Sequence, residues 1–273
     1  PLGWAAASLQ STPELPPPAL LAVYAGSVAW VFGYDTIYAV QDMADDGTHH
    51  VSLTGEAVLR AADIAVPRDP SSAAFPMVAA LLTPASDITI PEIGMNPLRT
   101  GLITTLMEMG GDITLSNERT EGGEPVADLR VRHSQLHGID VPAARAASMI
   151  DEYPILAIAA TQADGVTRMT GVSELRVKET DRIAVVADGI AAAGGSVSYD
   201  EDSMTVTGGN IAGGVIIASQ NDHRIAMSFL TLGMVSDAAI TVTGCMTINT
   251  SFPDFATLMN GCGAVLAAAG GDT

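Results

Sequence analysis

A dense group of charged side chains lies over residues 174–182, which read Glu-Leu-Arg-Val-Lys-Glu-Thr-Asp-Arg. Lys178 is the only lysine of the chain, and it stands between Arg176 and Arg182. The chain as a whole has 12 Lys and Arg residues against 31 Asp and Glu residues. Cations gathered in one place within an acidic protein can balance a negative charge, so we expect these residues to form part of an anion-binding site.

Further candidates stand at the predicted starts of two helices. Asp151 and Glu152 precede one apolar run of helical length, and the triplet Asp222-His223-Arg224 precedes another. Helix N-termini favour anions, because their first backbone N–H groups point outward and the helix dipole is positive there. Lys178, Glu179 and Arg182 fall at a predicted strand-to-helix turn.

A simpler reading of each candidate stays open. An aspartate before a helix is most often an N-cap, which is worth about 1 kcal/mol and carries no chemistry. The charges around Lys178 can form a solvated ion-pair network worth under about 1 kcal/mol per pair. The combination of these residues in matching positions is more specific than any one of them.

The composition excludes several kinds of partner. The formal net charge is −19 and the isoelectric point is about 4.3, so nucleic acids and anionic membrane surfaces are repelled. The most apolar segment, Ala19–Phe32, is too short to span a bilayer. No basic secretory leader is visible, and we therefore expect a cytoplasmic protein without a membrane or nucleic-acid partner.

The chain has two cysteines, Cys245 and Cys262, which fit a reducing compartment and show no metal-ligand spacing. We expect two buried free thiols, with a disulfide between them as the alternative. The sequence therefore predicts no metal site.

A repeated layout organises most of the chain. Three stretches begin at Asp69, Asp151 and Asp222, and each passes from an apolar run of helical length into a short β-branched strand. A second predicted helix follows each strand. These second helices are predicted over Thr100–Met109, Asp181–Ala193 and Asp254–Leu266. After the first two units come further strands, such as Ser196–Tyr199 and Met204–Gly208.

This layout predicts a pseudo-threefold α/β domain of helix–strand repeats over residues 67–273. Residues 1–66 fit the pattern less well, with two strands expected over Val51–Val66, and are interpreted as a partial unit of a neighbouring N-terminal lobe. Pseudo-threefold packing should bring the charged helix starts together at one end of the domain.

Several motifs, in order along residues 51–266, resemble the 5-enolpyruvylshikimate-3-phosphate synthases (3-phosphoshikimate 1-carboxyvinyltransferases), most closely the class that contains glyphosate-tolerant bacterial members. The principal motifs are Leu175-Arg-Val-Lys-Glu-Thr-Asp-Arg182, Asn221-Asp-His-Arg-Ile-Ala-Met227 and Thr250-Ser-Phe-Pro-Asp-Phe255. The supporting motifs are Asp69-Pro-Ser-Ser-Ala-Ala-Phe-Pro76, Met95-Asn-Pro-Leu-Arg-Thr-Gly101 and Ser148-Met-Ile-Asp-Glu-Tyr-Pro154.

The resemblance implies an enzyme of the shikimate pathway, which leads to chorismate and the aromatic amino acids. Such an enzyme transfers the enolpyruvyl group of phosphoenolpyruvate to the 5-hydroxyl of shikimate 3-phosphate, with no metal or organic cofactor. The implied fold has two lobes of three repeats each, with the substrates in the cleft between them. Residues 67–273 would be the C-terminal lobe.

The same resemblance implies roles for individual residues. Asp151 would contact the attacking hydroxyl with Lys178 beside it, and Glu179 would donate and accept the proton at the enolpyruvyl methylene. Two guanidinium groups would offset the charge of the anionic substrates. The residues implied to bind phosphoenolpyruvate are Arg182 and Arg224, with His223 close by.

The sequence departs from the family pattern at both ends. The early basic segment of the family and its phosphoenolpyruvate-flanking loop have no counterpart here, and Val265 stands where relatives have a lysine. Ser8 and Gln10 are the residues that could correspond to a Ser-x-Gln motif for shikimate 3-phosphate.

These departures leave three hypotheses. The chain forms an active transferase with a complementary N-terminal chain, or it is a non-catalytic ligand-binding remnant of the family. The third is a related enolpyruvyl transferase that acts on UDP-N-acetylglucosamine. The positions of Cys245 and Cys262 argue against it, because neither lies in the cysteine loop of that enzyme.

Overall fold

The computed structural model describes residues 42–43, 49–50 and 65–268. The chain divides into two units, residues 1–63 and residues 64–273. In the first unit, the strands β1 (Asp42–Met43) and β2 (His49–His50) pair antiparallel. The apolar segment 19–40 and residues 51–64 lie outside the described residues, and so do most of the strands expected over 51–66. In the described part of the chain, no helix is long and apolar enough to cross a membrane.

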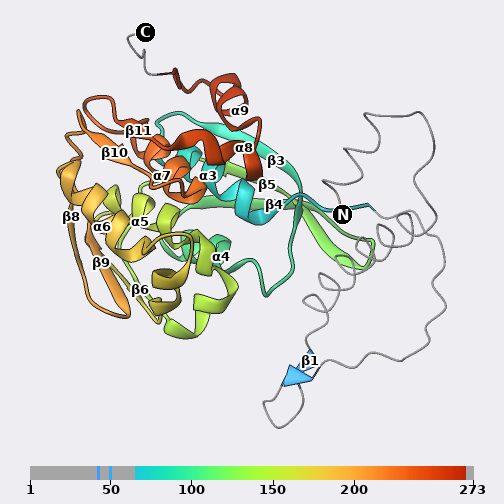
Figure 1. Cartoon of the computed structure of the whole chain (residues 1–273). Helices are drawn as coiled ribbons and strands as arrows, with labels where there is room; N and C mark the ends of the chain where they lie inside the picture. Colours follow the sequence, from blue (N-terminus) through green and yellow to red (C-terminus); the bar gives the residue numbers. More distant parts are fainter. Residues whose placement is uncertain (1–41, 44–48, 51–64, 269–273) are drawn as a thin grey trace, which may run out of the picture. The chain divides into compact units, whose positions relative to one another are not determined.

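The second unit contains the three predicted repeats, each opening with an apolar helix and a strand (Figure 1). The first repeat comprises α3 (Pro70–Leu82), β3 (Asp87–Gly94), α4 (Gly101–Glu108), β4 (Asp112–Glu121) and β5 (Glu124–Arg132). The second comprises α5 (Tyr153–Thr161), β7 (Val166–Thr170), α6 (Arg182–Ala192), β8 (Ser196–Tyr199) and β9 (Ser203–Thr207). The third comprises α7 (His223–Leu232), β11 (Thr241–Thr243), α8 (Ile248–Ser251) and α9 (Phe255–Gly261).

Short elements connect the repeats. Strands β6 (Asp140–Val141) and β10 (Ile216–Ala218) precede the second and third repeats. Four 3₁₀ turns complete the described unit: η1 (Ala143–Ser148), η2 (Ile150–Glu152), η3 (Ser173–Val177) and η4 (Cys245–Thr247).

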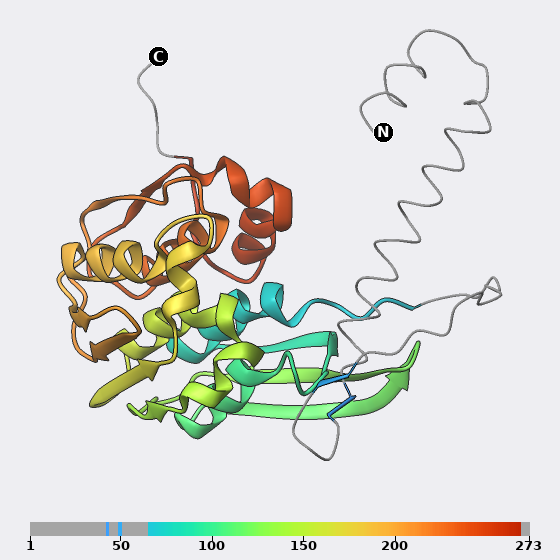
Figure 2. The same cartoon turned by 60° about the horizontal axis from the view of Figure 1, so that its bottom comes forward.

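Each repeat has a sheet of its own. The strand orders are β3-β5-β4 in the first, β6-β7-β9-β8 in the second and β10-β11 in the third. Long antiparallel ladders join β5 to β3 and to β4, whereas β10 and β11 pair in parallel. Figures 1 and 2 show the sheets around the outside of the helices α3, α5 and α7.

The core lies where α3, α5 and α7 contact one another pairwise. All nine residues of α5 are buried, and α3 is buried from Ala73 to Leu82. A helix that is apolar on every side has no face suited to water, so it must lie in the interior. The mixed α/β fold of helix–strand repeats predicted from the sequence is thus confirmed.

Capping residues explain where several helices start. The carboxylates of Asp69 and Asp222 each accept two backbone N–H groups of the helix that follows, and Asp181 accepts the N–H of Ala184. These bonds satisfy donors that the first turn of a helix leaves without a partner. The predicted second helices over Thr100–Met109 and Asp181–Ala193 are confirmed to within one residue at each end.

Two expectations about the C-terminal region were wrong. The predicted helix Asp254–Leu266 is α9, which ends at Gly261 because Gly263 takes a positive φ of 103°. The Asn260 side chain then bonds the backbone of Leu266 through both its amide oxygen and its amide nitrogen. Cys245 and Cys262 are free thiols as expected, but Cys245 is half-buried and Cys262 is exposed, so neither belongs to the core.

Candidate functional site

The charged residues singled out in the sequence meet at the N-terminal ends of the helices. Asp151 lies in η2, Lys178 directly follows η3, Arg182 opens α6 and Arg224 is the second residue of α7. Direct ion pairs link these four residues and Glu179. The convergence expected from pseudo-threefold packing is therefore confirmed.

Arg182 is the centre of this cluster. Its side chain is only 1% exposed, yet three carboxylates surround its guanidinium group. Nε donates to Asp222 at 2.7 Å, NH1 to Asp151 at 2.9 Å and NH2 to Glu179 at 2.5 Å. The reading of this segment as a solvated network fails at Arg182, which is buried and whose charge depends on these partners.

Asp222 has two roles at once. Its carboxylate caps α7 through the N–H groups of Arg224 and Ile225, and it also binds the Arg182 guanidinium. Burial opposes the charge of Asp222, but the hydrogen bond and the charge of Arg182 outweigh it and lower the pKa of the carboxyl group. Asp222 is thus more than a cap, because it is the fully buried counter-ion of Arg182.

Asp151 is not the cap of α5. It lies one residue before the N-cap position, and its carboxylate faces three cations. Arg182 NH1 is 2.9 Å away, Lys178 Nζ 3.5 Å and Arg224 NH2 3.9 Å. Burial opposes the charge of Asp151, but Arg224, Lys178 and Arg182 outweigh it and lower the pKa. Asp151 is therefore held as a carboxylate within reach of solvent.

Lys178 and Glu179 occupy the more open side of the cluster. Lys178 Nζ lies 2.8 Å from Glu174 and 3.5 Å from Asp151, and its side chain is 23% exposed. Burial opposes its charge, but these two carboxylates outweigh burial and raise the pKa of Lys178. The Glu179 side chain is 51% exposed, which leaves its carboxylate accessible to a ligand.

His223 opens α7 beside this group. Burial, together with the charge of Arg224, lowers the pKa of the imidazole, although Asp222 and Glu179 act in the opposite direction. A neutral imidazole can donate one hydrogen bond and accept another. His223 therefore adds a polar group rather than a further positive charge.

The structure shows contacts of residues for which the sequence implied no individual role, among them the candidate Glu152. Glu152 is 7% exposed and accepts a hydrogen bond from the buried hydroxyl of Ser71, which in turn accepts one from Arg99 NH2 at 3.2 Å. Arg224 NH1 lies 3.4 Å from Glu152. The sequence signal was the acidic pair at residues 151–152, in which the second carboxylate falls on an otherwise apolar, buried segment.

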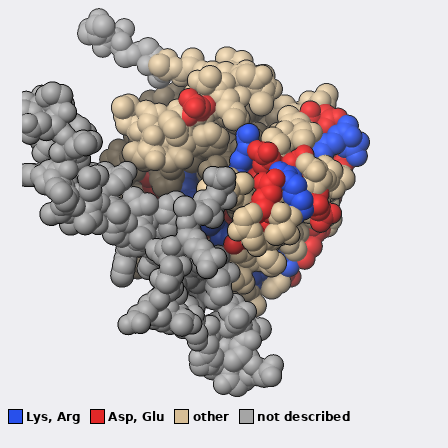
Figure 3. Space-filling view, turned by 90° about the vertical axis from the view of Figure 1, so that its right-hand side faces the viewer, with Lys and Arg blue, Asp and Glu red and all other residues tan. Residues whose placement is uncertain are grey.

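Positive charge is outnumbered at this site. Among the described residues, the connected ion pairs comprise three cations and five carboxylates, a formal balance of −2. Figure 3 shows the same intermixing on one face of the second unit, where cationic and acidic side chains lie next to one another. An anion that binds here must compete with carboxylates for the guanidinium groups.

Two other expectations concern ligands. Ser8 and Gln10 lie outside the described residues. Within the described part, no group of three or more His, Cys, Asp or Glu side chains is arranged to hold a metal ion.

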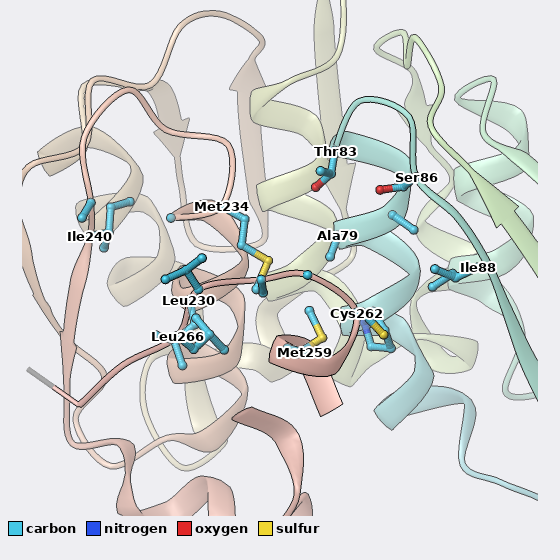
Figure 4. Close-up of a pocket in the computed structure, with 17 residues that line it drawn as sticks. Ala79, Thr83, Ser86, Ile88, Leu230, Met234, Ile240, Met259, Cys262 and Leu266 are labelled. Carbon is cyan, nitrogen blue, oxygen red and sulfur yellow. The ribbon is translucent and has the colours of Figure 1, made fainter. Parts of the chain in front are cut away.

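A separate pocket of about 350 Å³ lies at the opposite ends of the central helices (Figure 4). Ala79 and Thr83 line it from the C-terminal end of α3, and Leu230 and Met234 line it from that of α7. The ten residues of α7 rise about 15 Å, which separates this apolar pocket from the charged cluster. Cys262 contributes a thiol to its wall.

Comparison with known proteins adds an independent line of argument. Residues 41–259 match the family described as EPSP synthase (3-phosphoshikimate 1-carboxyvinyltransferase). A 3-phosphoshikimate 1-carboxyvinyltransferase of Parvibaculum lavamentivorans is 60% identical over 216 residues, which cover 78% of this chain and 48% of that protein. One of Rhodospirillum rubrum is 58% identical over 222 residues, covering 81% of this chain and 49% of that protein.

A solved structure agrees with these relatives. An EPSP synthase from Acinetobacter baumannii superposes with a TM-score of 0.77 and 44% sequence identity. The match covers 84% of this chain and 53% of that one. The chain thus spans about half the length of the curated relatives it matches.

Proposed function

The chain belongs to the EPSP synthase family, and on that basis we propose that it takes part in carboxyvinyl transfer. The reaction moves the enolpyruvyl group of phosphoenolpyruvate to the 5-hydroxyl of shikimate 3-phosphate and releases phosphate. The observation that supports this most is the junction of Asp151, Lys178 and Glu179 around the buried Arg182. The names of the relatives do not favour the alternative transferase for UDP-N-acetylglucosamine.

In the proposed mechanism, Asp151 and Glu179 divide the proton transfers. Asp151 is held ionised by its cationic neighbours and would accept the hydrogen bond of the attacking 5-hydroxyl. Glu179, after taking a proton from solvent, would deliver it to the methylene carbon while the hydroxyl oxygen bonds to the adjacent carbon and gives its own proton to Asp151. In the second step Glu179 would take a proton back from the methyl group as phosphate leaves. Both carboxylates contact Arg182, which supports their adjacency in such a site.

The cations would bind and orient the anionic substrates. Arg224 and Lys178, with side chains 16% and 23% exposed, are the more accessible cations for phosphoenolpyruvate, with His223 beside them. Arg182 would act on the substrates mainly through its charge rather than by direct contact, because it is buried and the more exposed Asp151 and Glu179 contact it. No metal or cofactor enters this proposal.

In this proposal, the remaining positive charge would come from outside the described residues. We propose that these cations belong to the half of the relatives' sequence that this chain does not match. A complementary N-terminal chain, or further residues of the same polypeptide, would supply that half. Residues 67–273 would then be the C-terminal lobe, residues 1–66 would belong to the N-terminal lobe, and Ser8 and Gln10 would bind shikimate 3-phosphate.

Two finer assignments accompany the proposal. The motifs around Asp69, Met95 and Ser148 support membership in the class with glyphosate-tolerant bacterial members. Assembled enzyme should then keep its rate in glyphosate concentrations that inhibit a sensitive relative. A cytoplasmic location is proposed because the pathway supplies precursors of aromatic amino acids.

Phosphate release from phosphoenolpyruvate and shikimate 3-phosphate tests the proposal. The chain would be assayed alone and with the N-terminal half of the 60%-identical relative. We expect activity in the mixture, a loss of at least a hundredfold in Glu179→Gln, and normal activity in the control Glu118→Gln, an exposed carboxylate on β4. A folded, associated pair that binds both substrates without turnover would instead favour a non-catalytic remnant.

A further inference from the structure

Glu152 is a buried carboxylate for which the proposed mechanism has no use. It occupies the N-cap position of α5, but its side chain turns to Ser71 of α3 and to Arg224 of α7. Its Oε1 atom accepts the Ser71 hydroxyl and lies 3.4 Å from Arg224 NH1. One oxygen atom thus joins three elements that are far apart in the chain.

The groups that face Glu152 do not balance its charge fully. Burial raises its pKa most strongly, and the adjacent Asp151 adds to this effect. The Ser71 hydroxyl, Arg224 and the more distant Arg99 act in the opposite direction without cancelling it. Glu152 therefore accepts a proton more readily than an ordinary glutamate.

Arg224 connects this carboxylate to the candidate anion site. Its NH1 group lies near the Asp151 carbonyl oxygen at 3.3 Å and near Glu152, while NH2 is 3.9 Å from the Asp151 carboxylate. The side chain is 16% exposed, so an anion can reach it. An anion on Arg224 would place another negative charge close to Glu152.

We propose that Glu152 is a positioning residue that couples proton uptake to anion binding. In its carboxylate form Glu152 holds the Arg224 side chain, and it takes a proton from solvent when an anion binds Arg224. The proposal rests on the proposed function only for the anion's identity as phosphoenolpyruvate. The binding and its proton are properties of this chain's own residues.

The neighbouring carboxylates explain why the proton goes to Glu152. Asp151 and Asp222 have lowered pKa values because cations contact them closely, whereas the single long contact from Arg224 supports Glu152 weakly. Ser71 can adapt to both states, because a hydroxyl group either donates to a carboxylate or accepts from a carboxylic acid. Protonation also removes one negative charge from a site in which carboxylates outnumber cations.

Sulfate is the suitable probe, because it stays a dianion throughout the working range and carries no proton of its own. Calorimetric titration of the full chain with sulfate, in buffers of different ionisation enthalpy between pH 5 and 8, measures the protons taken up. We expect net uptake, and an affinity that falls with rising pH by up to about tenfold per pH unit. Absence of sulfate binding, or binding without proton uptake, would overturn the proposal.

Matched variants assign the proton to its residue. Glu152→Gln keeps the size and the acceptor for Ser71, and it should abolish the uptake and flatten the pH dependence of affinity. Glu174→Gln removes another carboxylate of the cluster and should leave the uptake intact. His223→Gln tests the imidazole next to Arg224 in the chain, and loss of uptake there but not in Glu152→Gln would refute the assignment.

A measurement on the unaltered chain tests the proposal even if the variants fail to fold. The ¹³C signal of the Glu152 carboxyl group should titrate at higher pH with sulfate than without it. An unchanged titration would contradict the proposal. Because sulfate is not a substrate, failure of carboxyvinyl transfer leaves this result standing, and failure of the proton coupling leaves the transferase assay unaffected.

Discussion

The N-terminal ends of α3 and α7, here called their openings, are capped in the same way but lie in different surroundings. Asp69 and Asp222 each cap their helix through two backbone N–H groups, and each pairs with an arginine, at 3.0 Å from Arg99 and at 2.7 Å from Arg182. The Asp69–Arg99 side chains are 47% and 56% exposed, whereas those of Asp222 and Arg182 are 0% and 1% exposed. Burial, rather than the cap or the ion pair, distinguishes the two positions.

This difference determines what each pair can do. Water screens an exposed ion pair, so the pair contributes little and either partner can be lost at small cost. A buried pair replaces hydration by fixed contacts, and removal of one partner leaves the other charge uncompensated. The Asp222–Arg182 pair therefore fixes the position of the charged cluster, whereas the Asp69–Arg99 pair mainly closes the start of a helix.

The largest effect is expected from Asp222→Ala, which removes the fully buried counter-ion of Arg182 and the cap of α7. The free energy of unfolding should fall by about 3–5 kcal/mol in urea denaturation. Combining Asp222→Asn with Arg182→Met should recover part of the loss of either single change, because no unpaired buried charge remains. If Asp222→Ala lowered the free energy of unfolding by less than about 1 kcal/mol, burial would not distinguish the opening of α7 from that of α3.

The next effect concerns the close approach of α6 to α7, the two helices whose N-terminal ends carry Arg182 and Asp222. A Cβ atom at Gly189 would lie 2.2 Å from Cζ of Phe229 in α7. Gly189→Ala should therefore reduce the free energy of unfolding by about 1–3 kcal/mol through overpacking, although alanine favours a helix by about 1 kcal/mol.

The exposed neighbour provides the control for this close approach. Asp188→Ala should be neutral or slightly stabilising in the same denaturation experiment, because Asp188 lies on the solvent side of α6. Equal results for the two variants would show that the helices accommodate a Cβ atom at Gly189 without cost.

Acid should affect the buried opening more than the exposed one. Since the pKa of Asp222 is lowered by folding, its contribution to stability is present above the unfolded value of about 3.8 and is lost as the pH falls through the folded value. Between pH 5 and 3, wild-type protein should lose about 1 kcal/mol more unfolding free energy than Asp222→Asn. Parallel pH profiles would show that Asp222 does not carry this dependence.

The smallest effect is expected at the exposed opening. Asp69→Ala should lower the free energy of unfolding by about 1 kcal/mol, the usual value of an N-cap. Asp69→Asn keeps an oxygen acceptor and should change it by a few tenths of a kcal/mol. A loss of 3 kcal/mol or more at Asp69 would mean that exposure is a poor guide to the difference between the two pairs.

Many features of the fold could be predicted from short segments. The aspartates at 69, 181 and 222 mark helix starts, and the apolar runs after 69, 151 and 222 predicted the buried helices. The end of α9 was missed, although Gly263 takes the positive φ of 103° that commonly ends a helix; after it the backbone returns and Leu266 bonds the Asn260 side chain. A cap depends on residues two or three positions away, whereas the end of α9 also depends on the path by which Leu266 comes back to the Asn260 side chain.

The candidate site divides in the same way. The charged motif at 174–182 and the triplet at 222–224 identified the participating side chains, because residue type and spacing are local properties. Packing of three repeats decided that Arg182 is buried, that Asp222 is its counter-ion across 40 residues, and that Glu152 meets Ser71 across 81. Burial and charge pairing arise from groups distant in the chain, so only the folded structure reveals which local signal is a cap and which is a charged centre.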